Sequence, residues 1–247
     1  MIENKYTNCL AFLTQKMNDD ILRYLTYLKN KVDGILDIWV LYDCSLQDID
    51  TNKYSNLKIF KYAFHTIDNF FHQGDFSLQN PLLALMKFAE YHEYSHYLLM
   101  ENDIVLNGCF SEFAQRINAE TEIDYIHIAT DILGGHKAHW PIKYIRNNPF
   151  TVLHFSWCQI FYISKRYLDV ASDFIQTNNS FYYEFLLPTM AYNGDFLIRQ
   201  FENYGYQFQL SWGPAELYEH KYQYERTDKT FYHPIKNLSM VDFNKIV

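Results

Sequence analysis

The chain has 247 residues, of which 49% are hydrophobic and 20% charged, so it can bury a large core and we expect it to fold. Its formal net charge of -8 argues against a protein that binds nucleic acid through clustered lysines and arginines. It contains no long apolar run that could span a bilayer, its start lacks the features of a signal peptide, and its four cysteines are scattered. We therefore expect a cytoplasmic protein with reduced thiols.

Apolar runs alternate with helix-start signals along the first half of the chain. We expect strands at residues 9–13, 35–42, 57–64 and 97–100, the last of which runs into residues 101–103 and out through residues 104–106. We expect helices at residues 18–30, 80–90 and 110–117, where Asn18 or Asp19 caps the first and Pro81 lies just inside the second. This alternation predicts an α/β fold with a mostly parallel central sheet and helices on both of its faces.

The second half is less regular. We expect strands at 125–129 and 159–164 and helices at 166–175 and 182–192, separated by a loop rich in glycine and proline. Aromatic residues make up 19% of the chain. Most of them are expected in the core, and a minority are candidates for binding sugar rings.

The acidic triplet Glu101-Asn102-Asp103 directly follows the apolar strand predicted at 97–100. Ligands of open α/β sheets bind at the carboxyl ends of the strands, so the triplet lies where a site is expected. Two carboxylates separated by one residue can hold Mg²⁺ or Mn²⁺, which prefer oxygen ligands and can bridge diphosphate oxygens. A solvated turn is the alternative interpretation.

The segment YLLMENDIVLNG, which contains the triplet, resembles the part of GT-A glycosyltransferases where an apolar strand runs into a D-x-D-type metal and diphosphate motif. The first position of the motif is Glu101 rather than aspartate. The resemblance implies that Glu101 and Asp103 bind a divalent cation and that Asn102 contacts the donor.

The segments SWCQIFYISKRYL and YYEFLLPTMA are similar to the acceptor-side half of inverting GT-A enzymes, particularly the branching N-acetylglucosaminyltransferases. This similarity implies that Glu184 is the general base, and that Trp157 and Gln159 contact the acceptor. Trp140, in the glycine-containing loop, is a further candidate for acceptor binding. A glutamate near a helix start can also simply stabilise the helix dipole, so a structural role for Glu184 remains open.

The segment FYHPIK near the C-terminus resembles endings of bacterial GT-A enzymes. It implies that His233 is a third metal ligand and that Lys236 contacts the diphosphate. A structural histidine and a surface lysine are equally open.

Donor contacts are also expected from the loops that follow the first two strands, because these loops face the same crevice. The candidates are Thr14, Gln15, Lys16 and Asp43. Branching enzymes of this type can work without a metal, so Mn²⁺ or Mg²⁺ dependence remains an expectation.

The resemblance as a whole implies one domain over residues 1–247, with a donor-binding half at about 1–106 and an acceptor-binding half at about 107–247. It implies transfer of a sugar from a nucleotide-sugar, with a UDP-sugar favoured, to a glycan or lipid-linked glycan, with inversion. The expected setting is cell-envelope or surface-glycan synthesis in the cytoplasm, with peripheral contact to the inner face of the membrane left open.

Two other functions remain open. His92, Glu93 and His96 match the H-E-x-x-H pattern of zinc metallopeptidases, which requires both histidines on one face of a helix. The second histidine directly precedes a predicted strand, which disfavours this function. The pair His136 and His139 is expected in a surface loop. A non-catalytic glycan-binding domain with a structural cation is the second alternative.

Overall fold

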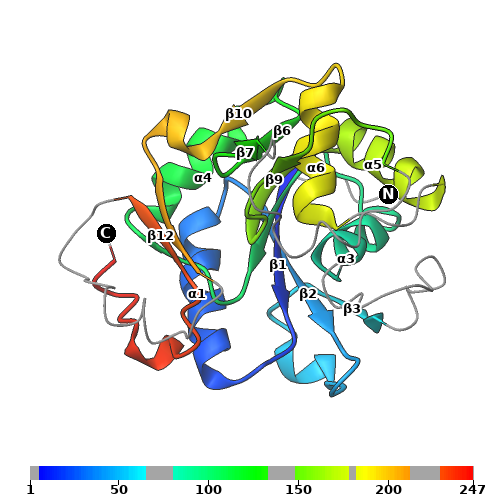
Figure 1. Cartoon of the computed structure of the whole chain (residues 1–247). Helices are drawn as coiled ribbons and strands as arrows, with labels where there is room; N and C mark the ends of the chain where they lie inside the picture. The colour runs from blue at the N-terminus through cyan, green and yellow to red at the C-terminus, as the bar shows by residue number, and fades with distance from the viewer. Residues whose placement is uncertain (1–5, 65–79, 133–147, 178–181, 212–228, 247) are drawn as a thin grey trace.

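The structure is a computed structural model that describes residues 6–64, 80–132, 148–177, 182–211 and 229–246. A seven-stranded sheet forms its centre, in the order β10-β6-β9-β4-β1-β2-β3 (Figure 1). Its strands are β1 (Asn8–Thr14), β2 (Asp37–Asp43), β3 (Ile59–Tyr62), β4 (His96–Glu101), β6 (Tyr125–His127), β9 (Ile160–Ser164) and β10 (Ile198–Gln200). All neighbours are parallel except β9, which is antiparallel to both β4 and β6. The predicted mostly parallel sheet is confirmed.

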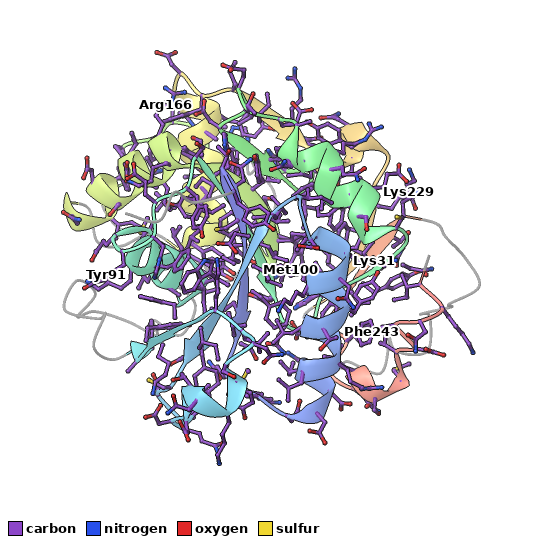
Figure 2. All side chains as sticks on the ribbon, turned by 180° about the vertical axis from the view of Figure 1, so that it is seen from behind. Lys31, Tyr91, Met100, Arg166, Lys229 and Phe243 are labelled. Atoms are coloured by element: carbon purple, nitrogen blue, oxygen red, sulfur yellow. The ribbon has the colours of Figure 1, made fainter. Side chains whose placement is uncertain are left out.

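Side chains along each strand point alternately to opposite faces of the sheet, so an apolar strand makes both faces apolar. Helices cover both of these faces. Leu10 and Phe12 of β1 pack into one core with α1 (Asp19–Val32) and α4 (Phe110–Asn118). Cys9 and Ala11 pack into a second core with α3 (Asn80–Ala89), α5 (Lys165–Thr177) and α6 (Tyr183–Asn193). Figure 2 shows Met100 near the centre of the molecule, beside α1, whereas Arg166 and Lys229 lie at the periphery.

Helix α1 shows why the chain turns where it does after β1. The side chain of Asn18 accepts a hydrogen bond from the Ile21 amide, which satisfies one of the free amides of the first turn. Asp19 and Asp20 lie in that turn and lysines in the last, as the helix dipole favours. Of the two cap candidates, Asn18 and Asp19, the structure therefore has Asn18, and this cap fixes the loop at 15–17 between β1 and α1.

A second, smaller sheet joins distant parts of the chain. It consists of β11 (Gln207–Leu210), β12 (Thr230–His233) and β5 (Val105–Asn107) in the order β11-β12-β5. β12 is antiparallel to β5, with Tyr232 opposite Val105. Since β5 begins just after the acidic triplet, this pairing brings the end of β12 next to it.

The remaining elements are short. β7 (Asp131–Ile132) pairs with β8 (His154–Phe155), and short 3-10 helices in the described ranges lie at η1 (Thr51–Tyr54), η5 (Phe201–Tyr204) and η6 (Leu238–Met240). The strands β7, β8, β10, β11 and β12 were not predicted from the sequence, and neither was β5 as a strand of a separate sheet. None of the helices in the described ranges is long and apolar enough to cross a membrane.

Candidate active site

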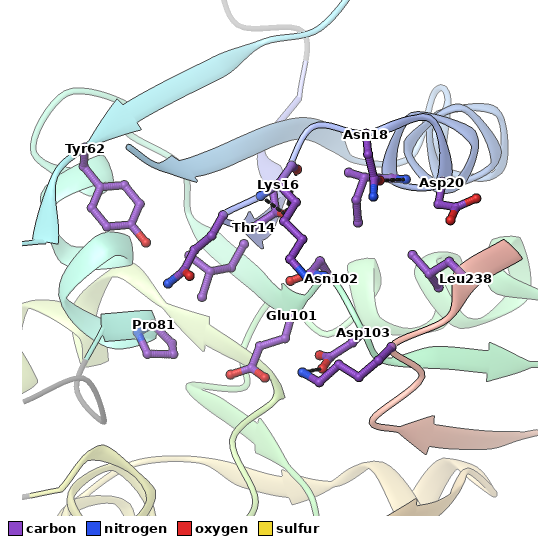
Figure 3. A pocket seen from close by; sticks show the side chains of 14 residues that line it. Thr14, Lys16, Asn18, Asp20, Tyr62, Pro81, Glu101, Asn102, Asp103 and Leu238 are labelled. Atoms are coloured by element: carbon purple, nitrogen blue, oxygen red, sulfur yellow. Dashed lines mark hydrogen bonds and ion pairs between the residues drawn. The ribbon is translucent and has the colours of Figure 1, made fainter. Parts of the chain in front are cut away.

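The parallel strands end together at one edge of the central sheet. Thr14 is opposite Tyr42, next to Asp43 at the end of β2, and Leu13 is opposite Glu101 at the end of β4. A cavity of about 350 Å³ opens at this edge. Figure 3 shows Lys16 and Asn18 on one side of it and Glu101 and Asp103 on the other. Polar groups from the loops after β1 and β4 therefore face one cavity.

Glu101, Asp103 and His233 form a compact group beside this cavity. Nε2 of His233 lies 3.4 Å from Oε2 of Glu101 and 3.3 Å from Oδ1 of Asp103. Each residue offers one ligand atom, and these atoms all lie within 4.8 Å of one another. Two carboxylates and an imidazole are a suitable donor set for Mn²⁺, and the carboxylates alone also suit Mg²⁺.

The charged groups of this site shift the pKa values of one another. Burial on its own would lower the pKa of His233, but its contacts with Asp103 and Glu101 raise that pKa to about 9. Burial would raise the pKa of Asp103, but His233 and Lys236 hold it well below its usual range. The buried carboxylate of Asp103 is therefore ionised and surrounded by positive charge.

Among the described residues, two lysines line the cavity. The ammonium group of Lys236 makes an ion pair with Oδ2 of Asp103, and the Lys236 side chain is 62% exposed. Lys16 is exposed and makes no ion pair with a described residue. Both ammonium groups are candidates for binding an anion in the cavity.

The predicted donor-binding residues lie at the same edge of the sheet. The Thr14 hydroxyl accepts a hydrogen bond from the Lys16 amide at 3.1 Å, which shapes the loop after β1. Gln15 donates from Nε2 to Oδ2 of Asp43 at 3.3 Å, and the other Asp43 oxygen accepts from the Ser45 amide. Thr14 and Gln15 line the cavity together with Asn102, whereas Asp43 does not line it and contacts Gln15.

Glu184 lies in the first turn of α6 and is 1% exposed. Its Oε1 accepts hydrogen bonds from Nε2 of Gln159 at 3.1 Å and from the Cys158 amide at 3.4 Å. Its Oε2 accepts no hydrogen bond from a described residue. Burial raises the pKa of Glu184 to about 8, an effect that Tyr182 and the Cys158 amide partly offset.

Glu184 is linked to the Glu101 group through one residue. The backbone carbonyl of Gln159 accepts from the Glu101 amide at 2.9 Å, while its side chain holds Glu184. The negative charge of Glu101 raises the pKa of Glu184, and the positive charge of His233 lowers it. The predicted metal ligands thus lie close enough to the predicted base to shift its pKa.

The other predicted acceptor residues are less directly placed. Trp157 is half-buried between β8 and β9, with its ring 5.7 Å from that of Phe155. Among the described residues, Trp157, Gln159 and Glu184 do not line the 350 Å³ cavity. Trp140 lies outside the described residues, as does the pair of histidines at 136 and 139.

The structure contradicts the metallopeptidase alternative. His96 lies in strand β4 and not in a helix, and its ring stacks on Tyr162 in the first core, with Nε2 at 3.1 Å from the Ile123 carbonyl. His92 stacks against Trp39 on the side of the second core. His96 lies with the first core and His92 lies beside the second core, so the two rings are on opposite faces of the sheet. They cannot bind one metal ion.

Sequence reasoning missed part of the cavity wall. Tyr62, Pro81 and Leu238 also line it. Tyr62 ends β3, so the rule that strand ends face the site could have identified it. Leu238 carried no such signal, because the sequence does not reveal that the C-terminal segment folds back beside α1.

No protein-family model matches this sequence, and no curated protein sequence matches it. The fold is similar to that of solved structures. The galactosyltransferase LgtC, in complex with donor and acceptor sugar analogues, aligns with a TM-score of 0.50 at 10% identity, over 97% of this chain and 93% of that chain. The mannosyltransferase Ktr4p of S. cerevisiae gives a TM-score of 0.46 at 13% identity, over 81% and 69% of the two chains.

A synthetase in complex with CTP is also among the similar structures. The CMP:2-keto-3-deoxy-manno-octonic acid synthetase, in complex with CTP, gives a TM-score of 0.43 at 11% identity, over 78% of this chain and 88% of that chain. At such identities similarity establishes the fold and not the reaction. The chain has the GT-A fold, as the resemblance of its sequence implied.

Proposed function

We propose that this protein is a glycosyltransferase that transfers a sugar from a nucleotide-sugar donor to a glycan acceptor. The observation that carries the proposal is the convergence of Glu101, Asp103 and His233 beside a cavity that Lys16 and Lys236 also line. A site with acidic and basic groups side by side suits a metal-bound diphosphate, whose charge both kinds of group can balance. Surface-glycan synthesis at the inner face of the membrane is the setting we propose.

Different residues of the protein would bind different parts of the donor. Glu101, Asp103 and, after loss of its ring proton, His233 would hold a divalent cation, which supplies positive charge against a leaving diphosphate. Lys16 and Lys236 would contact the phosphate oxygens. A nucleoside would extend from the diphosphate toward the ends of β1 to β3, and we assign Gln15 and its partner Asp43 to its recognition.

We assign the general-base role to Glu184. In one displacement, the acceptor hydroxyl gives its proton to Oε2 of Glu184, the acceptor oxygen bonds to the anomeric carbon, and the bond from that carbon to the diphosphate breaks. This displacement inverts the anomeric centre. Support comes from Oε2, which accepts no hydrogen bond from a described residue, and from a pKa of about 8, which makes the carboxylate, once ionised, a stronger base than an ordinary glutamate. Since Glu184 is 1% exposed, an acceptor must displace its neighbours to reach it.

The first experiment is a thermal-shift screen with UDP, CDP and GDP and their sugars, each with Mn²⁺, Mg²⁺ or EDTA. A nucleotide at a hundred times its Kd should raise the midpoint of unfolding by roughly 5–10 °C. Asp103→Asn should abolish the metal-dependent part of this rise. Asp20→Asn is the matched control, since Asp20 lines the same cavity but lies outside the metal-ligand group.

If a UDP-sugar stabilises the protein in this screen, its transfer to glycan acceptors should then be measured. If no nucleotide stabilises the protein with any metal, the glycosyltransferase proposal is wrong. Stabilisation by glycans alone, without nucleotide, would favour the glycan-binding domain instead.

A further inference from the structure

The ion pair between Lys236 and Asp103 occupies the carboxylate that a divalent cation needs. Asp103 has two oxygens, of which Oδ1 lies 3.3 Å from His233 and Oδ2 contacts the Lys236 ammonium. The Asp103 side chain is 4% exposed. A carboxylate so deeply buried requires a positive partner, because an unpaired charge in the interior is costly. Lys236 is one positive partner of Asp103, and His233 is the other.

The backbone on either side of Lys236 is anchored, whereas its side chain is largely exposed. The Ile235 amide donates to the backbone carbonyl of Asp103 at 2.7 Å, and Ile235 and Leu238 are fully or almost fully buried. The Lys236 side chain itself is 62% exposed and lines the cavity. Its ammonium can therefore leave Asp103 and move within the cavity without a change in the fold.

We infer that Lys236 is an exchangeable counter-ion of Asp103, which a divalent cation replaces when a diphosphate gives the ammonium a new partner. The inference rests on the proposed function. The ammonium and a dication repel each other and cannot share Oδ2 at short distance, so the cation alone must displace Lys236 into water. When a diphosphate is also present, the displaced ammonium binds phosphate oxygens.

The consequence is a cation and a nucleotide that bind cooperatively. Each ligand removes an obstacle to the other, and the coupling is reciprocal, as linkage requires. The cation on its own binds weakly to this protein, and the complete pair binds tightly. The lysine thereby makes the site select the metal–diphosphate complex over either component.

The test uses the substitution Lys236→Met, which keeps an unbranched side chain and removes the charge. Mn²⁺ affinity is measured by calorimetry without nucleotide, and UDP affinity is measured at saturating Mn²⁺. Because the competitor is gone, K236M should bind Mn²⁺ alone about tenfold more tightly than the wild type. Because a phosphate contact is lost, it should bind UDP at saturating Mn²⁺ about tenfold more weakly.

Lys16→Met is the matched control. Lys16 lines the same cavity but does not pair with Asp103, so K16M should weaken UDP binding and leave Mn²⁺ affinity without nucleotide unchanged. Lys236→Arg, which keeps a cation near Asp103, should return Mn²⁺ affinity toward the wild-type value.

The outcomes separate the two proposals. Equal Mn²⁺ affinity of the wild type and K236M, with UDP binding intact in the wild type, would overturn the exchange and leave the glycosyltransferase proposal standing. A wild-type protein that binds neither Mn²⁺ nor UDP with Mn²⁺ would overturn both. An increase of Mn²⁺ affinity in K16M equal to that in K236M would show a general charge effect and would also overturn the exchange.

Discussion

Replacing Glu184 by glutamine removes a buried carboxyl whose proton affinity differs greatly between the folded and unfolded chain. Its pKa rises from 4.5 to about 8 on folding, because burial disfavours the ionised form. The folded protein therefore holds this proton more tightly than the unfolded chain. Stability is gained where the carboxyl is protonated, and this gain is lost as the pH rises from about 4.5 to about 8.

The size of the effect follows from the two pKa values. Each tenfold difference in proton affinity is worth about 1.4 kcal/mol, so the loss reaches at most about 5 kcal/mol across this range. Relaxation around the charge reduces the loss, and we expect about 3 kcal/mol. Glu184→Gln does not titrate, and its amide oxygen can still accept from the Cys158 amide and Gln159. Its stability relative to the wild type should therefore rise with pH by that amount.

The assay is urea unfolding of both proteins at pH 5, 6, 7 and 8, with Glu93→Gln, an exposed glutamate, as the control. The free energies of unfolding of E184Q and the wild type should be similar at pH 5 and diverge in favour of E184Q by pH 8. E93Q should follow the wild type at every pH. A constant difference between E184Q and the wild type across the range would refute the raised pKa.

The remaining predictions concern the site and its surroundings. In a transfer assay, Glu184→Gln should lower the rate by roughly 10²- to 10⁴-fold while UDP binding is unchanged, and near-normal transfer would contradict the base assignment. His233→Gln should weaken Mn²⁺ binding in calorimetry, whereas His92→Gln should not; a dependence on His92 would return the peptidase alternative. Arg166→Met should lower the free energy of unfolding in urea by about 1–3 kcal/mol, because Arg166 pairs with the buried carboxylate of Asp124; no loss would mean that this carboxylate is satisfied without it.

The sequence identified the elements that carry local signals. β1 and β4 are continuous apolar runs that are buried on both faces of the sheet, and α1 carries a cap, a dipole pattern and an amphipathic face. Their boundaries were predicted to within two residues. The acidic triplet could be assigned to a site because it follows such a strand.

Other elements gave no usable signal. β10, β11 and β12 have three or four residues each, and β11 alternates only between exposed and half-buried positions. Such strands are specified by their partners rather than by their own residues. Likewise, the motif at 92–96 satisfied a metal-site pattern, yet a strand begins at its second histidine. The position of His233 beside Glu101 was expected only from family resemblance, since its cause is the pairing of β12 with β5.

That pairing makes the candidate metal site a long-range contact. Glu101 and His233 are separated by more than half of the chain and meet only after β12 has docked on β5. A growing chain that has emerged only as far as β11 would contain the acidic turn but lack both the imidazole and Lys236. Metal-dependent nucleotide binding should therefore appear late and abruptly during folding, and it would serve as a marker of the completely assembled domain.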